Sequence, residues 1–225
     1  MKTLSAALLA VIVLALPALS SAAPVVRSGP YVSGFVGASF ARDTTISGFD
    51  SFNAVSYNDQ ASFDPGIYVG GTGGYNFGFV RLEGELAYRH AQIDGITDST
   101  GTPFRSVDGD IGVFSTMFNV YFDLVNTSRI TPYLGGGIGF ANVNLSRTTA
   151  VNNSGNRAIL YDESNDTVFA SQVGAGIDFA INNRSSIDLG YRYFITDKAR
   201  LNGDFTSSDL RFESHNMLVG FKFKF

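Results

Sequence analysis

The stretch that decides the fold is MLVGFKFKF, residues 217–225, in which every odd position is apolar and the last five residues alternate strictly between Phe and Lys. The odd positions are Met or Val and then three phenylalanines, whereas the even positions are Leu218, Gly220, Lys222 and Lys224. Successive side chains of a β-strand point to opposite faces, so this pattern predicts a strand with one aromatic face and one face that carries two lysines. Chain ends are loose unless something holds them, and we therefore expect neighbouring strands on both sides.

The same period of two recurs along the chain and predicts eight strands, with no sustained helical period between them. The strands fall near residues 30–41, 65–77, 79–90, 111–124, 132–144, 167–180, 186–196 and 212–225. Long polar gaps follow the first, third, fifth and seventh strands, and short gaps follow the second, fourth and sixth. A meander with four long surface loops at one end and tight turns at the other is typical of outer-membrane β-barrels. The fold class predicted is all-β, an eight-stranded antiparallel up-and-down transmembrane β-barrel.

The two faces of each predicted strand separate cleanly, and glycines crowd the polar face, as the interior of a narrow barrel requires. We expect a lumen charge network of nearly balanced sign, formed by Arg81, Glu83, Glu85, Arg89, Asp123, Asp178, Asp188, Arg192, Lys222 and Lys224. Aromatic residues near strand ends predict girdles at the lipid headgroups: Tyr31, Tyr75, Phe77, Tyr88, Phe122, Tyr193 and Phe223. The alternative is a soluble lipocalin-like barrel with the apolar face inside, which the loop asymmetry and the export signal disfavour.

The fourth strand has an ambiguous register, because VFSTMFNVYFDL (113–124) is apolar on both faces. We place Phe114, Phe118, Val120 and Phe122 toward lipid, which leaves Asn119, Tyr121 and Asp123 inside.

The first residues have the features of a secretory signal peptide: Lys2, an apolar run from Leu4 to Leu16, and small residues at Ser20 and Ala22. We expect residues 1–22 to be cleaved and residues 23–225 to form a single barrel domain. The chain contains no cysteine, which excludes disulfides and thiolate metal sites. A formal charge of −4 gives no basis for binding nucleic acid. Few lysines follow the predicted signal, consistent with a small water-exposed area.

The motifs GYNFGFVRLEGELAYR (74–89), TPYLGGGIGFANV (131–143) and HNMLVGFKFKF (215–225) resemble the small eight-stranded outer-membrane β-barrel proteins. That group includes the OmpA transmembrane domain, the Opa-like barrels and the α-proteobacterial surface antigens. The resemblance covers essentially the whole mature chain. It implies a Gram-negative cell outer membrane as the location, reached through the periplasm, with outer-membrane lipid and lipopolysaccharide around the barrel. It also implies that Phe221, Phe223 and Phe225 form an assembly signal read by the barrel assembly machinery.

Three functions remain open at this point. We favour a structural or surface protein with a side-chain-filled polar lumen, whose long loops interact with a host or another cell surface. A narrow porin-like channel for small solutes is the alternative, although eight strands leave little diameter. A lipid-modifying enzyme is disfavoured, because Ser214 and His215 in ESHN (213–216) would point to opposite faces of a strand. We expect no catalytic residues, no cofactor and no metal site.

Overall fold

The computed structural model describes residues 28–50, 55–99, 101–126, 128–151, 157–161, 163–202 and 206–225, so the predicted signal peptide lies outside the described residues. The described part of the chain contains thirteen strands. They are β1 (Gly29–Ala41), β2 (Thr44–Asp50), β3 (Val55–Phe63), β4 (Gly66–Asn76), β5 (Val80–Thr97), β6 (Arg105–Asp108), β7 (Asp110–Asp123), β8 (Ile130–Leu145), β9 (Thr148–Val151), β10 (Arg157–Tyr161), β11 (Ser164–Ala180), β12 (Ser185–Asn202) and β13 (Thr206–Lys224).

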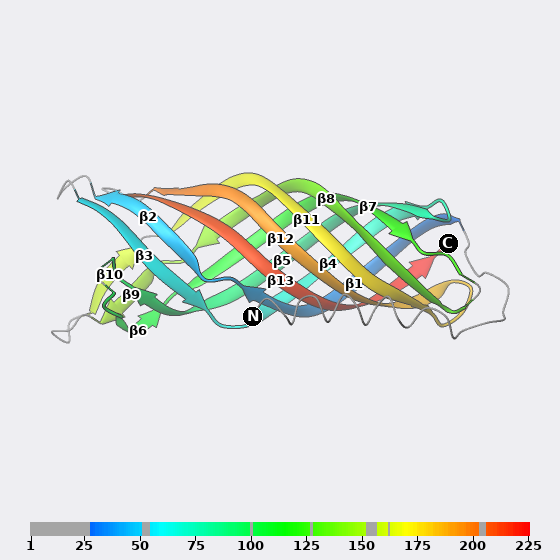
Figure 1. Ribbon diagram of the computed structural model, residues 1–225, viewed down its shortest axis with the longest axis horizontal. Coiled ribbons are helices and arrows are strands. Elements are labelled where there is room, and N and C mark those ends of the chain that lie inside the picture. Colours follow the sequence, from blue (N-terminus) through cyan, green and yellow to red (C-terminus); the bar gives the residue numbers. More distant parts are fainter. Residues whose placement is uncertain are drawn as a thin grey trace.

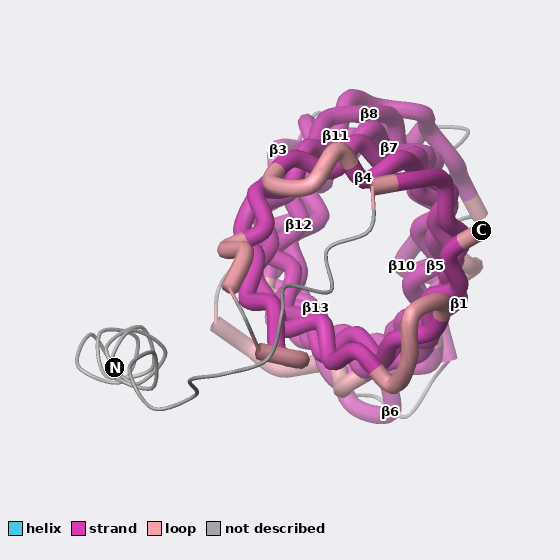
Figure 2. Tube along the Cα trace, turned by 90° about the vertical axis from the view of Figure 1, so that its right-hand side faces the viewer, coloured by secondary structure: helices cyan, strands magenta, loops and turns pink. Residues whose placement is uncertain are grey.

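The strands close into one antiparallel barrel. Neighbouring strands follow the order β1–β4–β5–β7–β8–β11–β12–β13, and β13 pairs with β1 to complete the ring, which Figure 2 shows from one end. Closure runs the length of β1, from Tyr31 opposite Lys224 to Ala41 opposite Ser214. Strand β2 continues β1 along β13, and β3 leads into β4, so the wall is eight strands around. The predicted fold class is confirmed, and the alternation of residues 217–225 belongs to the strand that closes the barrel.

The strand cores match the sequence prediction, but the strands reach further into the long gaps than predicted. Strand β5 continues to Thr97, β12 to Asn202, and the gap before residue 65 contains the hairpin of β2 and β3. Three further strands, β10, β9 and β6, form a small sheet from the second and third long gaps. In Figure 1 these additions lie at the left, opposite the end that carries the chain's C-terminus and the short turns. We call the two ends the long-loop end and the short-turn end.

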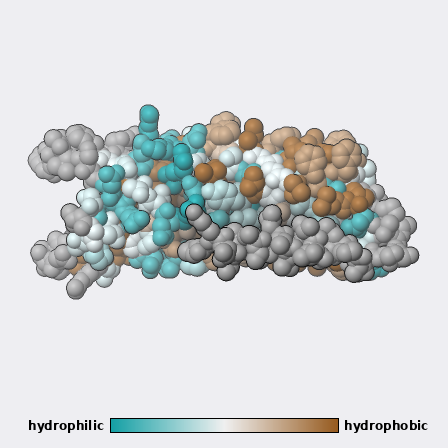
Figure 3. All heavy atoms as spheres, viewed as in Figure 1, coloured by the Kyte–Doolittle hydropathy of each residue, from teal (hydrophilic) through white to brown (hydrophobic). Residues whose placement is uncertain are grey.

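A band of apolar side chains surrounds the outside of the barrel toward the short-turn end. Figure 3 shows hydrophobic residues gathered over that half and hydrophilic residues over the other. On this side of the barrel the exposed apolar side chains run from Met217 to Phe225, a height of about 20 Å for residues that rise about 3.3 Å each at a tilt of about 40°. That height is close to the apolar band of a transmembrane barrel, about 25 Å. Within the described chain, no helix is long and apolar enough to cross a membrane.

Most of the aromatic residues predicted near the strand ends face outward, and one does not. Tyr75, Phe77, Tyr88 and Phe122 are exposed on the outer surface. Tyr31 was predicted to join them, and this prediction is wrong, because its side chain points inward and is only 2% exposed. Its neighbours Pro30 and Val32 take the outward positions of β1. Side chains therefore alternate along this strand as expected, and Tyr31 lies on the inward face.

The interior of the barrel has two layers of opposite character. Toward the short-turn end it is filled by charged and polar side chains, whereas toward the long-loop end it is a hydrophobic core. That core draws on β2, β3, β5, β7, β8, β11, β12 and β13 and contains Ile46, Ala61, Ala91, Ile93, Ile96, Ile111, Val113, Met117, Ala141, Val143, Leu145, Ala170, Phe194, Ala199, Leu210 and Phe212. The strand extensions at the long-loop end are apolar inside and polar outside, as in a water-soluble barrel. This pattern indicates that they lie outside the membrane.

Candidate functional site

The charged interior of the barrel is centred on Glu85, whose carboxylate has four polar partners. Arg192 of β12 crosses the lumen and forms an ion pair with Glu85. The hydroxyl of Tyr68 donates to Glu85 Oε1 at 3.0 Å, and the amides of Asn119 and Gln172 donate to Oε2 at 2.9 and 3.0 Å. Glu85 and Arg192 are both buried. A buried ion pair is tolerated when further hydrogen bonds satisfy its remaining lone pairs, as they do here.

A second group of charges lies nearer the short-turn end. Arg81 Nε is 2.8 Å from Asp123 Oδ1, and Arg81 Nη1 is 3.0 Å from Glu83 Oε1. Tyr31 donates to the same Glu83 oxygen at 2.5 Å, and Asn76 donates to Asp123 at 3.0 Å. One arginine therefore pairs with two carboxylates that come from different strands, β5 and β7, and the hydrogen bonds from Tyr31 and Asn76 satisfy those carboxylates further.

The closing strand β13 supplies the third group. Lys222 forms an ion pair with Asp178 of β11 and lies near the ring of Tyr31. Asp188 has no cation within ion-pair distance among the described residues and instead accepts a hydrogen bond from Tyr133 at 2.7 Å. The glycine at position 190 makes room for that tyrosine, because a Cβ there would lie 2.8 Å from the Tyr133 hydroxyl. The Gly-rich inner face thus lets long polar side chains cross the lumen.

Arg89 differs from Arg81, Arg192 and Lys222 because, among the described residues, no carboxylate forms an ion pair with it. Its guanidinium lies between two rings, 4.5 Å from the centroid of Tyr68 and 3.8 Å from that of Phe194. Nη1 donates to Ser115 at 2.8 Å, whereas Nε and Nη2 have no hydrogen-bond partner in the part of the chain that the structure describes. The aromatic faces compensate part of its charge at the boundary between the polar and apolar layers.

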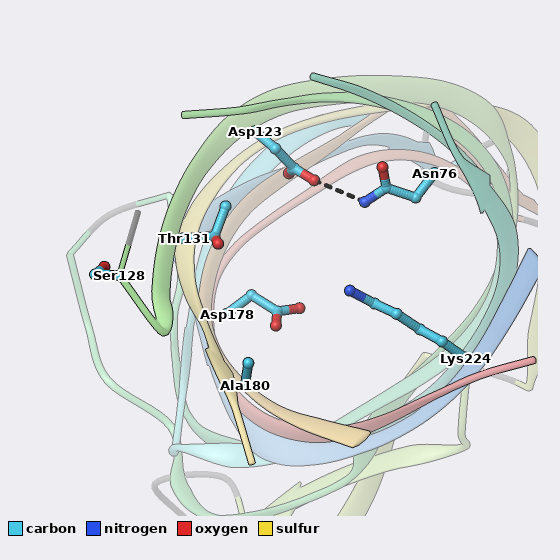
Figure 4. A pocket seen from close by; sticks show the side chains of 7 residues that line it. All are labelled: Asn76, Asp123, Ser128, Thr131, Asp178, Ala180 and Lys224. Atoms are coloured by element: carbon cyan, nitrogen blue, oxygen red, sulfur yellow. Dashed lines mark hydrogen bonds between the residues drawn. The ribbon is translucent and has the colours of Figure 1, made fainter. Parts of the chain in front are cut away.

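At the short-turn end the lumen opens into a small cavity, shown in Figure 4. Asn76, Asp123, Asp178 and Lys224 line it, and the Lys224 side chain points across the opening toward the two aspartates. Its volume is about 20 Å³, which is room for roughly one water molecule. This mouth leads directly into the packed charges above it.

Eight of the ten predicted lumen residues belong to these three groups, whereas Arg89 lies between aromatic rings and Lys224 lines the mouth. Arg81, Glu83, Glu85, Arg89, Arg192 and Lys222 are fully buried, and Asp123, Asp178 and Asp188 are nearly so. Sequence reasoning missed the neutral partners Tyr31, Tyr68, Asn76, Tyr133 and Gln172, which hydrogen-bond the carboxylates or the amide of Asn119. The signal was present, since each lies on the inward face of its strand. In the fourth strand, Phe114, Phe118 and Phe122 are exposed, whereas Asn119, Tyr121 and Asp123 point inward.

The residues considered for catalysis lie on opposite sides of the barrel wall. Ser214 is fully buried and hydrogen-bonds Asn216, whereas His215 is on the outer face, where Nδ1 is 2.7 Å from the Tyr191 hydroxyl. The other histidine, His90, lies on β5, with Nδ1 3.8 Å from Asp110. No serine therefore lies beside a histidine and an acid in this segment. Among the described residues, no group of three or more His, Cys, Asp and Glu side chains could hold a metal ion.

Comparison with known proteins gives the same architecture. Residues 6–225 match the family model of the outer membrane protein β-barrel domain. The chain is 28% identical over 202 residues to outer membrane protein PagN of Salmonella typhimurium, covering 84% of this chain and 83% of that protein. It is 25% identical over 235 residues to the 31 kDa outer-membrane immunogenic protein of Brucella melitensis, covering 98% and 94%.

Among solved structures, the chain resembles the outer membrane protein OprG of Pseudomonas aeruginosa. The TM-score is 0.56 at 16% identity, and the alignment covers 88% of this chain and 98% of that one. At this identity the likeness concerns the fold alone.

Proposed function

The chain belongs to the outer membrane protein β-barrel domain family, and on that premise we propose that it is a surface protein whose closed barrel carries a binding platform outside the cell. The barrel spans the outer membrane, with the short turns in the periplasm and the long loops outside. The function lies in the extracellular part, which we propose contacts a ligand on a host or on another cell.

One observation carries this proposal: the strands continue beyond the apolar band around a hydrophobic core of their own. A barrel needed only as a membrane plug has no use for that core. Phe104, between β5 and β6, packs against it, and β6, β9 and β10 form a sheet across the second and third loops. Ordered loops lose less conformational entropy on binding than flexible ones, so this arrangement favours recognition.

The test is to shorten the loops while leaving the barrel intact. Residues 148–161 are replaced by a short Gly-Ser linker, and the attachment of cells that display the variant is compared with that of cells displaying the wild type. We expect attachment to fall to the background of cells without the protein. The compact form seen before boiling on a gel, together with surface labelling, shows that the variant is folded and displayed. Unchanged attachment would reject this loop region as the binding platform.

The proposal includes a role for Phe221, Phe223 and Phe225 as the signal for the barrel assembly machinery. These side chains share the outward face of β13, and Phe225 is 73% exposed. The rings of Phe223 and Phe225 meet edge to face at 5.6 Å. We expect deletion of Phe225 to reduce the amount inserted into the outer membrane more than the amount exported, as measured by fractionation. Equal losses in both fractions would contradict this role.

A further inference from the structure

The wall of the barrel splits between β11 and β12 at the long-loop end. In the described residues, the ladder between these strands ends at Ala170 opposite Thr196, although both strands continue beyond it. Over this length β11 stays paired with β8, and β12 stays paired with β13. In Figure 1 the yellow β11 and the orange β12 separate toward the left. We call the space between residues 165–169 of β11 and residues 198–202 of β12 the seam.

A β-bulge in β12 lies where the ladder stops. The register of β12 against β13 shifts between Ile195 and Lys198, whereas that of β11 against β8 runs on without a shift. A bulge bends its strand and interrupts the pairing beside it. Strand β12 therefore follows β13, strand β11 follows β8, and the two strands part.

Backbone groups of both strands face the seam. In an antiparallel sheet, alternate residues of a strand direct their N–H and C=O groups to the same neighbour. Ala180 of β11 donates its N–H to Arg129, on the β8 side, so odd-numbered residues of β11 such as Thr167 point to the β12 side. From the other strand, the N–H of Arg200 points toward β11. The seam thus lies between two strand edges, which are templates for a further strand.

The carboxylate of Asp166 accepts a hydrogen bond from each edge of the seam. Its Oδ2 accepts from the backbone N–H of Arg200 at 2.8 Å, and its Oδ1 accepts from the backbone N–H of Thr167 at 2.8 Å. These two donors are of the kind that the carbonyl groups of an intervening strand would satisfy. No ladder pair between the described parts of β11 and β12 crosses the seam. Asp166 is therefore the side chain that a strand in the seam has to displace.

The inner and outer sides of the seam differ in polarity. On the inner side, Val168 packs against the hydrophobic core, to which Ala170 and Ala199 belong. On the outer side, Thr167 and Arg200 are exposed. Successive side chains of a strand point alternately to such opposite faces. A segment that fits the seam therefore alternates apolar with polar residues.

From these features we propose that the seam binds an extended peptide segment of another protein, which enters as an additional strand between β11 and β12. Its backbone pairs with both edges, its apolar side chains join the inner core, and Asp166 is released to solvent. A second copy of this chain fits less well, because its eight wall strands already pair on both sides in the closed ring. This inference rests on the proposed position of the long-loop end outside the cell, and not on the platform of β6, β9 and β10.

The first test measures the binding of a fluorescent peptide to the full-length folded protein in detergent by anisotropy. The probe has about eight residues, in which valine alternates with threonine and glutamate. We expect the wild type to bind it, and Asp166→Ala to bind it about tenfold more tightly, because no carboxylate then competes for the two N–H groups. Asn165→Ala is the matched control and should bind as the wild type does.

Thr167→Pro blocks one edge of the seam. Proline removes an N–H that faces the seam and leaves the ladder with β8 intact, as proline does on an edge strand. This variant should bind the probe at least about tenfold more weakly than the wild type. A second peptide with the same side chains carries N-methyl groups at alternate residues, so it lacks the donors for one edge and should not bind measurably.

Hydrogen–deuterium exchange with mass spectrometry locates the bound probe. A strand inserted in the seam should slow exchange in both segments 163–169 and 197–202, because it pairs with both edges. Protection of one segment alone would reject insertion. Gel mobility before boiling shows that each variant is folded.

Three further results would overturn the proposal. The first is the absence of probe binding by both the wild type and Asp166→Ala. The second is equal binding of the N-methylated peptide, which would show adsorption to an apolar surface instead of strand pairing. The third is a dimer of the protein without peptide in native mass spectrometry that Thr167→Pro abolishes, which would assign the seam to a second copy. Cell attachment plays no part in these measurements, so a failure here leaves the proposed function of the loops standing.

Discussion

Single substitutions separate the two buried arginines at the centre of the barrel, because Arg192 and Arg89 have different partners. Arg192 forms an ion pair with Glu85, which three neutral groups also hydrogen-bond. Arg89 has aromatic faces, one serine and two guanidinium nitrogens, Nε and Nη2, without a hydrogen-bond partner among the described residues. Removing one partner of a buried ion pair leaves an uncompensated charge, whereas removing a cation that lacks a carboxylate leaves none. We therefore expect the two arginines to contribute differently to the stability of the folded barrel.

Arg192→Leu is therefore expected to destabilise the folded barrel strongly. The substitution leaves Glu85 buried beside Tyr68, Asn119 and Gln172, and a broken buried ion pair costs about 3–5 kcal/mol. The measurement is the temperature at which the compact gel form converts to the extended form. Arg129→Leu, on a short turn, is the matched control and should convert at the wild-type temperature. Should Arg192→Leu convert there too, Glu85 would have to be neutralised by another group.

Arg89→Met is expected to have the opposite outcome. Methionine fills the space between Tyr68 and Phe194 without leaving an unpartnered donor, and sulfur makes favourable contacts with rings. Replacing a poorly satisfied buried polar group by an apolar one of similar shape is nearly neutral or stabilising. The conversion temperature should stay at or above that of the wild type. A loss as large as that of Arg192→Leu would show that the aromatic contacts of Arg89 contribute more than its burial costs.

At the scale of strands, the period of two was enough to place the barrel wall. It predicted the cores of all eight wall strands, because each must present an apolar face to lipid over about 9–11 residues. It failed beyond the membrane, where the apolar face turns inward. Ile46, Ile93 and Leu210 belong to the inner core there, although they lie in gaps that read as polar loops. The sequence of a single strand does not reveal where its apolar face turns from outside to inside, because that point depends on where the membrane ends.

Partners within the lumen were less predictable than faces. The sequence placed Arg192 in the lumen network without fixing its partner, and in the structure it pairs with Glu85 on the opposite wall. Asp188 lies on the same strand face as Arg192, but Tyr133 takes its carboxylate. Which residues meet across a barrel depends on strand tilt and stagger, and these are set by the whole ring rather than by any local pattern.

The strand extension at the long-loop end has a seam between β11 and β12, where the carboxylate of Asp166 links the two strands. In the described residues, the ladder between these strands ends at Ala170 opposite Thr196. Beyond that point the backbone N–H of Arg200 donates a hydrogen bond to Asp166 Oδ2 at 2.8 Å. The backbone N–H of Thr167 donates to the other oxygen of the same carboxylate, Oδ1. The Asp166 carboxylate thus accepts a hydrogen bond from the Arg200 N–H, a donor that the ladder between β11 and β12 does not use at this exposed strand edge.

Asp166→Ala is expected to loosen this seam without affecting the membrane part. A hydrogen bond to a charged group is worth about 1.5 kcal/mol or more, so the Arg200 amide should exchange its hydrogen about tenfold faster. Hydrogen–deuterium exchange with mass spectrometry measures this in the segment 197–202, with the segment 186–195 as an internal reference. Asn165→Ala, at an exposed neighbouring position, is the control. Equal exchange in both variants would show that the seam is held by packing alone.

For the whole molecule, we expect the two interior layers to act in series against the passage of solutes. The polar layer is closed by Glu85, Arg192, Asn119 and Gln172, which reach across from different walls. The apolar layer above it is packed around Phe194 and Phe212, whose rings are 6.3 Å apart. Ions enter a dry apolar region at a high energetic cost, so either layer alone is a barrier.

A closed lumen predicts that the protein in planar lipid bilayers gives current traces without stepwise conductance. Removal of one layer should not open it: the double variant Phe194→Ala, Phe212→Ala empties part of the apolar core but leaves the ion pair of Arg192 with Glu85 below. We expect flat traces for this variant too, while a wide porin in the same bilayer gives steps. Steps from the wild type would favour the channel alternative. Steps from the double variant alone would mean that the apolar layer is the barrier and that the charged layer conducts.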